Sequence, residues 1–128
     1  MDRAFLAFGA WFGFFAVAFG AFGSHALSAR LAPERIGTFE IGVRYQLYHG
    51  LAMFVVVFLR TIGPDTFAET LAGILFIAGV ILFSGSLYLL AITGVRRWGA
   101  VTPFGGLCLL GGWLLVAWAI ASTTFRFA

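Results

Sequence analysis

The polar side chains that could carry chemistry are concentrated between residues 24 and 49. This segment, called the polar hinge below, contains both histidines of the chain, His25 and His49, together with Glu40 and Arg44. The sequence on either side is almost continuously apolar, and 62% of the 128 residues are hydrophobic. Because ionisable groups in or near a membrane are costly unless they are paired or hydrated, such residues point to a ligand, lipid or partner site. A structural role is the simpler alternative, since Glu40 and Arg44 have the spacing of an ion pair that stabilises a helix.

Hydroxyl groups and one further tyrosine lie in later apolar segments, near the ends that should meet the polar hinge. In a bundle whose helices alternate in direction, these ends come together on one side of the membrane. The predicted polar site therefore consists of His25, Glu40, Arg44, Gln46, His49, Ser84, Ser86, Tyr88 and Thr102.

Most familiar catalytic and cofactor chemistries lack their residues here. Two histidines at adjacent helix ends could ligate haem, but histidines at helix ends are also ordinary interfacial residues and no CxxCH motif is present. The single cysteine, Cys108, is distant from both histidines, so no metal-ligand spacing is recognisable. Neither Ser84 nor Ser86 has an acid–base partner on its own helix. We expect no enzyme activity, no catalytic residues, no metal and no cofactor.

The composition requires a membrane to position these residues. Charged residues make up 10% of the chain, against about 25% in an average soluble domain. A membrane span needs about 20 apolar residues, so the chain has room for several spans and short connections. The sequence predicts an all-α membrane protein, a single domain of residues 1–128 with four transmembrane helices in an up-down bundle. The expected spans are residues 4–23, 44–60, 67–93 and 102–121, with a short interfacial helix over residues 33–43 between the first two.

Local signals mark the ends of these helices. Pro33 followed by an acid is typical of a helix start, and residues 63–65, Gly-Pro-Asp, predict a turn. Thr66 and the glutamate three residues later have the spacing of a capping box. Gly94 is expected to end the third span, and Thr102-Pro103 to begin the fourth with Thr as N-cap and Pro at the first helical position. Residues 125–127, Phe-Arg-Phe, are expected to form an interfacial tail.

Small residues recur at helical spacing in the first, third and fourth spans. Steps of four or seven residues keep them on one face, where they allow neighbouring backbones to approach closely. The helix-packing residues predicted in this way are Gly9, Gly13, Ala72, Gly79, Gly105 and Gly112. These faces exceed what one bundle should bury, which favours association with further copies or partners. The alternative is that glycine is simply common in membrane helices.

The arginines predict the orientation in the membrane. Five of them (30, 35, 44, 96 and 97) belong to one side and three (3, 60 and 126) to the other. Because cytoplasmic loops carry the excess of positive charge, both termini are expected outside the cytoplasm. The scattered arginines do not suggest nucleic-acid binding.

Four ordered blocks resemble the signature of a known family. They are residues 19–27 (FGAFGSHAL), 43–49 (VRYQLYH), 82–88 (LFSGSLY) and 102–106 (TPFGG). The chain resembles the small membrane proteins catalogued as domain of unknown function 423, which are similar to the eukaryotic transmembrane protein 256 group. Ser24 stands where that family usually has alanine. The resemblance implies a four-helix bacterial inner-membrane protein and no established activity.

The sequence leaves three functions open. The first is a non-enzymatic membrane protein that acts by association, as a homo-oligomer or an accessory subunit of a larger membrane complex. The second is small-solute or lipid binding, or transport, through the polar site at one membrane face. Transport has less support, because the small multidrug transporters of similar size carry a carboxylate within the first span, and here only Asp2 lies near it, at its start. The third is a haem-binding redox protein.

Overall fold

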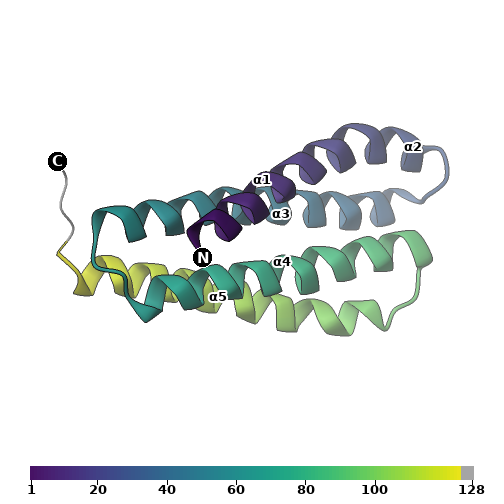
Figure 1. The fold of residues 1–128 in the computed structure, drawn as a ribbon. Helices are drawn as coiled ribbons and strands as arrows, with labels where there is room; N and C mark the ends of the chain where they lie inside the picture. The colour runs from purple at the N-terminus through teal and green to yellow at the C-terminus, as the bar shows by residue number, and fades with distance from the viewer. Residues whose placement is uncertain (125–128) are drawn as a thin grey trace.

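The computed structural model describes residues 1–124, and the secondary structure in that part of the chain is helical. In chain order the elements are α1 (Asp2–Ala18), the π-helix η1 (Phe19–Gly23), α2 (Ser24–Ser28), α3 (Pro33–Ile62), α4 (Phe67–Thr93) and α5 (Trp98–Ser122). Four helical segments are long and apolar enough to cross a membrane, the first running from Asp2 to Ser28 through the π-helix. They alternate in direction, as Figure 1 shows. The predicted all-α architecture with four spans is confirmed, while the tail predicted for residues 125–127 lies outside the described residues.

The helices pack in chain order, α1 on α3, α3 on α4 and α4 on α5. The α2–α3 and α4–α5 turns lie at one end of the bundle, called the hinge end below, and the α3–α4 turn and the chain termini lie at the other (Figure 1). Helix α1 crosses α3 at an angle. The beginning of α1 lies against α4, where the ring of Phe5 occupies the space beside Gly73. A Cβ atom added at Gly73 would lie 2.5 Å from Cζ of Phe5.

The core is formed by apolar side chains from all four spans, among them Phe5, Met53, Phe76 and Val116. In a bilayer such packing is not driven by removal from water, so close van der Waals contact between helices has to hold the bundle together. Small residues provide this contact.

Most of the small residues predicted for helix packing lie inside this single chain. A Cβ atom at Gly9 would lie 2.9 Å from the carbonyl oxygen of Gly50 on α3. On the α4–α5 contact, Gly79 faces Leu109, Gly105 faces the backbone of Phe83, and Gly112 faces the Phe76 ring, 2.5 Å from the place of a Cβ atom. Ala72 is fully buried. Gly13 differs, because no atom lies within 4 Å of a Cβ added there.

The second span is longer than expected. Residues 33–43 are helical, but they form the first part of α3 and run without a break into the membrane. The segment contains no proline after Pro33, and nothing in it interrupts the hydrogen-bonded ladder. The 30-residue helix is about 45 Å long at 1.5 Å per residue, so it extends beyond the roughly 30 Å hydrocarbon layer.

The fourth span begins at Trp98, four residues before the expected start, and Pro103 lies inside α5 instead of at its first position. The earlier start is made possible by a tight turn: the amides of Trp98, Gly99 and Ala100 donate to carbonyls three residues back in residues 95–97. These bonds satisfy first-turn donors that would otherwise need a cap.

The helix ends around α4 follow their sequence signals in part. Gly94 takes the left-handed conformation with φ 71°, and its amide donates to the carbonyl of Leu90. Thr66 is the N-cap residue of α4, but its hydroxyl donates to the carboxylate of Glu69 and makes no cap bond to the backbone. The reciprocal bonds of a capping box are therefore absent at this end of α4.

Candidate functional site

The contact between α3 and α4 depends on the absence of a side chain at Gly42. A Cβ atom there would lie 2.7 Å from Cε1 of Tyr88 and 3.3 Å from the carbonyl oxygen of Ser84. In the space this provides, the fully buried hydroxyl of Ser84 donates to the Gly42 carbonyl at 2.7 Å. Close helix contact and an interhelical hydrogen bond thus occur at the same place.

Gln46 connects three spans with one amide. Its Nε2 donates to the carbonyl of Phe12 on α1 at 2.8 Å, and its Oε1 accepts from the hydroxyl of Tyr88 on α4 at 2.7 Å. The side chain is 5% exposed. Because an unpaired amide is costly in an apolar medium, these two bonds fix the relative positions of α1, α3 and α4.

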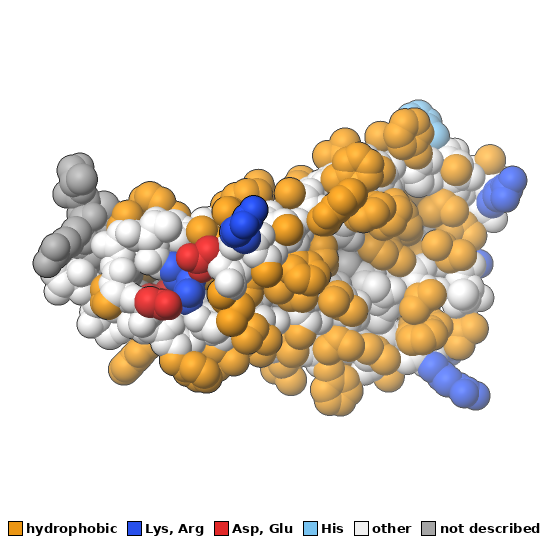
Figure 2. All heavy atoms as spheres, in the orientation of Figure 1, with side chains coloured by type: hydrophobic (Ala, Val, Ile, Leu, Met, Phe, Trp, Pro, Cys, Tyr) orange, Lys and Arg blue, Asp and Glu red, His pale blue; other side chains and the backbone are white. Residues whose placement is uncertain are grey.

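An apolar groove of about 350 Å³ lies above this pair, between the first span and α4. Its walls are Phe12, Phe15 and Phe19 on one side and Val80, Ile81 and Gly85 on the other, and Gln46 and Tyr88 form its floor. Figure 2 shows the hollow between the apolar side chains of the two helices. No atom lies within 4 Å of a Cβ added at Gly85, so this glycine leaves the groove open.

The hinge-side end of the groove is formed by aromatic rings. The Tyr88 ring contacts Phe19 and Phe39, with ring centroids 5.4 and 5.0 Å apart. Phe19 is also the first residue of the π-helix η1. π-Helical turns in α-helices are frequent at functional sites.

His49 is buried on the α5 side of α3. Its Nδ1 lies 2.6 Å from the carbonyl oxygen of Tyr45, and its Nε2 accepts from Nε1–H of Trp113 at 3.1 Å. Since an indole nitrogen can only donate, the proton of the imidazole is on Nδ1. Both ring nitrogens are engaged, so a haem iron or metal ion could bind this residue only after one of these bonds was lost.

The other predicted site residues lie elsewhere. His25 is exposed on α2, and Glu40 and Arg44 form an exposed ion pair with a distance of 3.7 Å. Ser86 and Thr102 join α4 to α5 through a 2.6 Å hydrogen bond between their hydroxyls. The structure thus brings together Gln46, Ser84 and Tyr88 and separates the remaining six residues from them.

No metal site is formed by the described part of the chain. Within residues 1–124, no three His, Cys, Asp or Glu side chains lie close enough together to hold a metal ion.

The sequence did not indicate the contacts of two arginines or the full burial of one glutamate. Arg35 donates to the last carbonyls of α4, and Glu69 is fully buried, with Thr66 donating to one carboxylate oxygen and no hydrogen-bond partner for the other among residues 1–124. Arg60 is 7% exposed and binds Asp2, Asp65 and Thr70. The contacts of Arg35 and Arg60 follow no local sequence pattern, because their partners lie on other helices or turns, whereas Thr66 and Glu69 have the spacing noted in the sequence.

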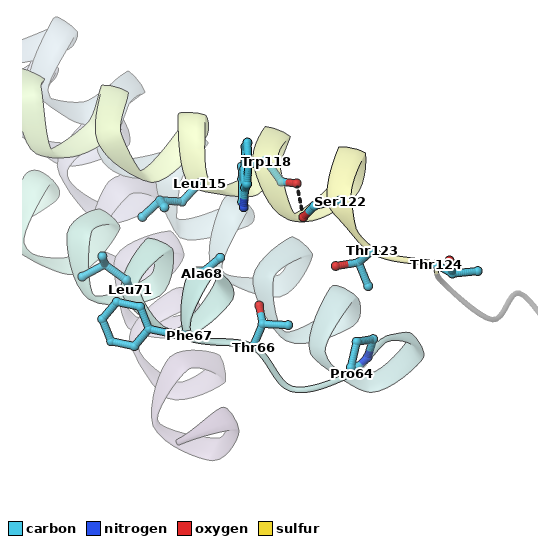
Figure 3. Close-up of a pocket in the computed structure, with 10 residues that line it drawn as sticks. All are labelled: Pro64, Thr66, Phe67, Ala68, Leu71, Leu115, Trp118, Ser122, Thr123 and Thr124. Atoms are coloured by element: carbon cyan, nitrogen blue, oxygen red, sulfur yellow. Dashed lines mark hydrogen bonds between the residues drawn. The ribbon is translucent and has the colours of Figure 1, made fainter.

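A second hollow of about 720 Å³ lies at the opposite end of the bundle, between the start of α4 and the end of α5. Figure 3 shows its lining, which includes Phe67, Leu71, Leu115 and Trp118. The hydroxyl of Ser122 donates to the Trp118 carbonyl and so offers no unpaired proton there. None of the predicted polar residues lines this hollow.

Comparison with known proteins finds relatives over nearly the whole chain. Residues 19–106 match the family described as "Protein of unknown function (DUF423)". The "UPF0382 membrane protein YwdK" of Bacillus subtilis is 39% identical over 89% of this chain and 93% of its own length. The "UPF0382 inner membrane protein YgdD" of Escherichia coli is 41% identical over 90% and 87%, and "UPF0382 membrane protein SH2409" of Staphylococcus haemolyticus is 38% identical over 98% of both. No solved structure matches.

Proposed function

The chain belongs to the DUF423 family of membrane proteins, as its four sequence blocks predicted, and from that premise we propose that it binds a lipid-soluble amphiphile in the groove between the first span and α4. It acts without catalysis, as a binding protein. The observation that carries this proposal is the Gln46–Tyr88 pair at the floor of an otherwise apolar groove within the membrane spans.

The chemistry of the floor suits a molecule with one polar group on an apolar chain. The Gln46 amide has a second N–H besides the one bonded to Phe12, and the Tyr88 oxygen has lone pairs to accept a hydrogen bond. A carbonyl or hydroxyl of the ligand would bind there, and its chain would lie along the phenyl rings of the walls. The groove volume of about 350 Å³ falls in the lower part of the range of about 300–1,000 Å³ usual for small-molecule sites.

The ligand would enter from the bilayer. Phe15 and Ile81, on opposite walls, are 42% and 58% exposed, so the mouth of the groove opens on the surface of the spans that faces lipid. A molecule dissolved in the membrane reaches the floor without crossing water.

A matched pair of substitutions tests the proposal. Gly85 and Gly13 are both half-buried helical glycines with no atom within 4 Å of an added Cβ, but only Gly85 lines the groove. In native mass spectrometry of protein extracted in mild detergent, Gly85→Leu should lose the retained amphiphile and Gly13→Leu should keep it. Equal retention by both variants, or no retained amphiphile in the unsubstituted protein, would overturn the proposal.

Association with further copies or partners is the second candidate function. Gly13 favours this function, because its open surface would let a helix from another chain approach. The glycines between α4 and α5 give it less support, because these two helices already pack against them. The same two variants test association, but here the substitution of Gly13 is expected to have the effect. If this chain acts as an oligomer or accessory subunit through α1, Gly13→Leu should shift the complex to smaller species in blue-native electrophoresis, and Gly85→Leu should not.

We further propose that the protein lies in the inner membrane with both termini outside the cytoplasm. The Escherichia coli relative is named an inner membrane protein. On the face drawn in Figure 2, basic side chains lie at the hinge end, and acidic side chains are mixed with basic ones at the other end. This distribution agrees with a hinge end that faces the cytoplasm.

A further inference from the structure

A separate pocket of about 380 Å³ lies at the hinge end, between the first turns of α3 and the end of α4. Arg35 and Thr38 line it from α3, and Gly94 and Arg96 line it from the turn before α5. Trp98 begins α5 two residues later. Because α4 ends here and tryptophan favours the membrane–water boundary, the pocket lies at the level of the lipid headgroups.

The guanidinium of Arg35 is held in place by the end of α4. Its Nε donates to the Ala91 carbonyl at 2.7 Å, and its Nη2 donates to the Ile92 carbonyl at 2.8 Å. A Cβ atom at Gly94 would lie 3.2 Å from Nη2, so glycine lets the turn close over the guanidinium. An arginine that is oriented before binding loses less entropy when it binds an anion.

Arg35 keeps most of its binding capacity. A guanidinium has five N–H donors, and the two contacts to α4 use two of them. Within residues 1–124 the ion pairs involve Arg44 and Arg60, and no carboxylate lies within 4 Å of Arg35 or Arg96. The pocket therefore combines an oriented and an exposed arginine with no carboxylate bound to either.

We propose that this pocket binds the phosphate group of an anionic phospholipid. The planar donors of arginine match phosphate oxygens, and a basic pocket between membrane helices at the headgroup level is suited to anionic lipids. Leu90 and Ala91 of α4 supply an apolar part of the lining, which suits the first part of the acyl chains. This site is separate from the groove, which lies between α1 and α4 and shares no lining residue with it.

The lining also contains one acid, Glu34. A carboxylate this close to a bound phosphate repels it, so the site should prefer a singly charged phosphodiester to a doubly charged phosphate ion. The repulsion also predicts the sign of a substitution, because Glu34→Gln should strengthen binding.

Arg96 and Arg97 supply a matched comparison for the experiment. Both are exposed in the same turn and carry the same charge, but only Arg96 lines the pocket. The full-length protein in mild detergent would be titrated in native mass spectrometry with phosphatidylglycerol and with phosphatidylcholine of the same chains. Arg96→Gln should lower the affinity for phosphatidylglycerol about fivefold, which corresponds to the usual contribution of one arginine near an anionic surface. Arg97→Gln should change it less than twofold, and Glu34→Gln should raise it.

Several outcomes would overturn the proposal. They are equal losses for Arg96→Gln and Arg97→Gln, equal binding of the two lipids, or a weaker affinity for phosphatidylglycerol in Glu34→Gln. Displacement of the lipid by millimolar inorganic phosphate would instead identify a site for the free ion. Gly85→Leu separates this inference from the proposed function, because blocking the groove should leave the preference for phosphatidylglycerol unchanged.

Discussion

The hydroxyl of Tyr88 donates a 2.7 Å hydrogen bond to Oε1 of Gln46, and this bond joins α4 to α3 at the floor of the groove. Replacing Tyr88 with phenylalanine keeps the ring and its contacts with Phe19 and Phe39 but leaves the Gln46 oxygen without this donor. Hydrogen bonds between membrane helices contribute on average about 0.6 kcal/mol and at most about 1.7 kcal/mol. Tyr88→Phe should lower the free energy of unfolding by an amount in that range.

The measurement is unfolding in mixed micelles with increasing denaturing detergent. Tyr48→Phe is the control, because Tyr48 is 54% exposed and its hydroxyl makes no hydrogen bond within residues 1–124. Equal losses in the two variants would show that the hydroxyl of Tyr88 makes no special contribution.

Gly42 should tolerate no side chain. Gly42→Ala places a methyl group 2.7 Å from the Tyr88 ring and 3.3 Å from the backbone of α4, so the ring must move and the α4 backbone must shift slightly. Overpacking of this kind costs about 1–3 kcal/mol. Gly37→Ala on the same helix meets no atom within 4 Å and should instead stabilise the helix by about 0.5–1 kcal/mol. The same unfolding assay would contradict the prediction if both substitutions had the same sign.

The four spans could be predicted because the bilayer requires long apolar helices, and the third expected span, residues 67–93, coincides with α4. The start of α5 could not, because proline is typical of a first helical position, whereas three consecutive turn bonds let this helix begin five residues before Pro103.

The predicted polar site combined residues that a helix holds apart. Ser84 and Ser86 are two positions apart on α4 and therefore point in different directions, toward Gly42 on α3 and Thr102 on α5. The different directions of these two serines could be predicted from their spacing in the sequence. The groove could not, because it is lined by residues of different helices, and no local sequence pattern shows which residues of α1, α3 and α4 lie side by side.

Arg60 should tolerate the loss of either acidic partner but not of both. Its side chain is 7% exposed and pairs with Asp2 at 2.5 Å and with Asp65 at 2.6 Å, while the two carboxylates are 43% and 68% exposed. Asp2→Asn or Asp65→Asn alone leaves one carboxylate on the guanidinium. The double variant leaves a buried charge with no carboxylate, so its loss of stability should exceed the sum of the single losses by at least about 0.5 kcal/mol.

A double-mutant cycle in the unfolding assay measures this excess. The control cycle combines Asp65→Asn with Glu40→Gln, whose carboxylate belongs to the exposed ion pair with Arg44 on another part of the bundle. These two losses should add. Additive losses for Asp2 and Asp65 would mean that the two acids do not share Arg60.

Of the two arginines at the terminal end within residues 1–124, Arg60 has a side chain that is only 7% exposed. Its charge is matched by two acids at the terminal end, which leaves Arg3 as the exposed arginine there within residues 1–124, against Arg30, Arg44, Arg96 and Arg97 at the hinge end. An excess of exposed positive charge at the hinge end should hold that end in the cytoplasm. Alkaline phosphatase fused after residue 128 should therefore be active and green fluorescent protein fused there dark, with the opposite result for fusions after residue 97. A fluorescent fusion at residue 128 together with an active phosphatase after residue 97 would contradict the prediction, because the hinge end keeps the arginine excess even when Arg60 is counted.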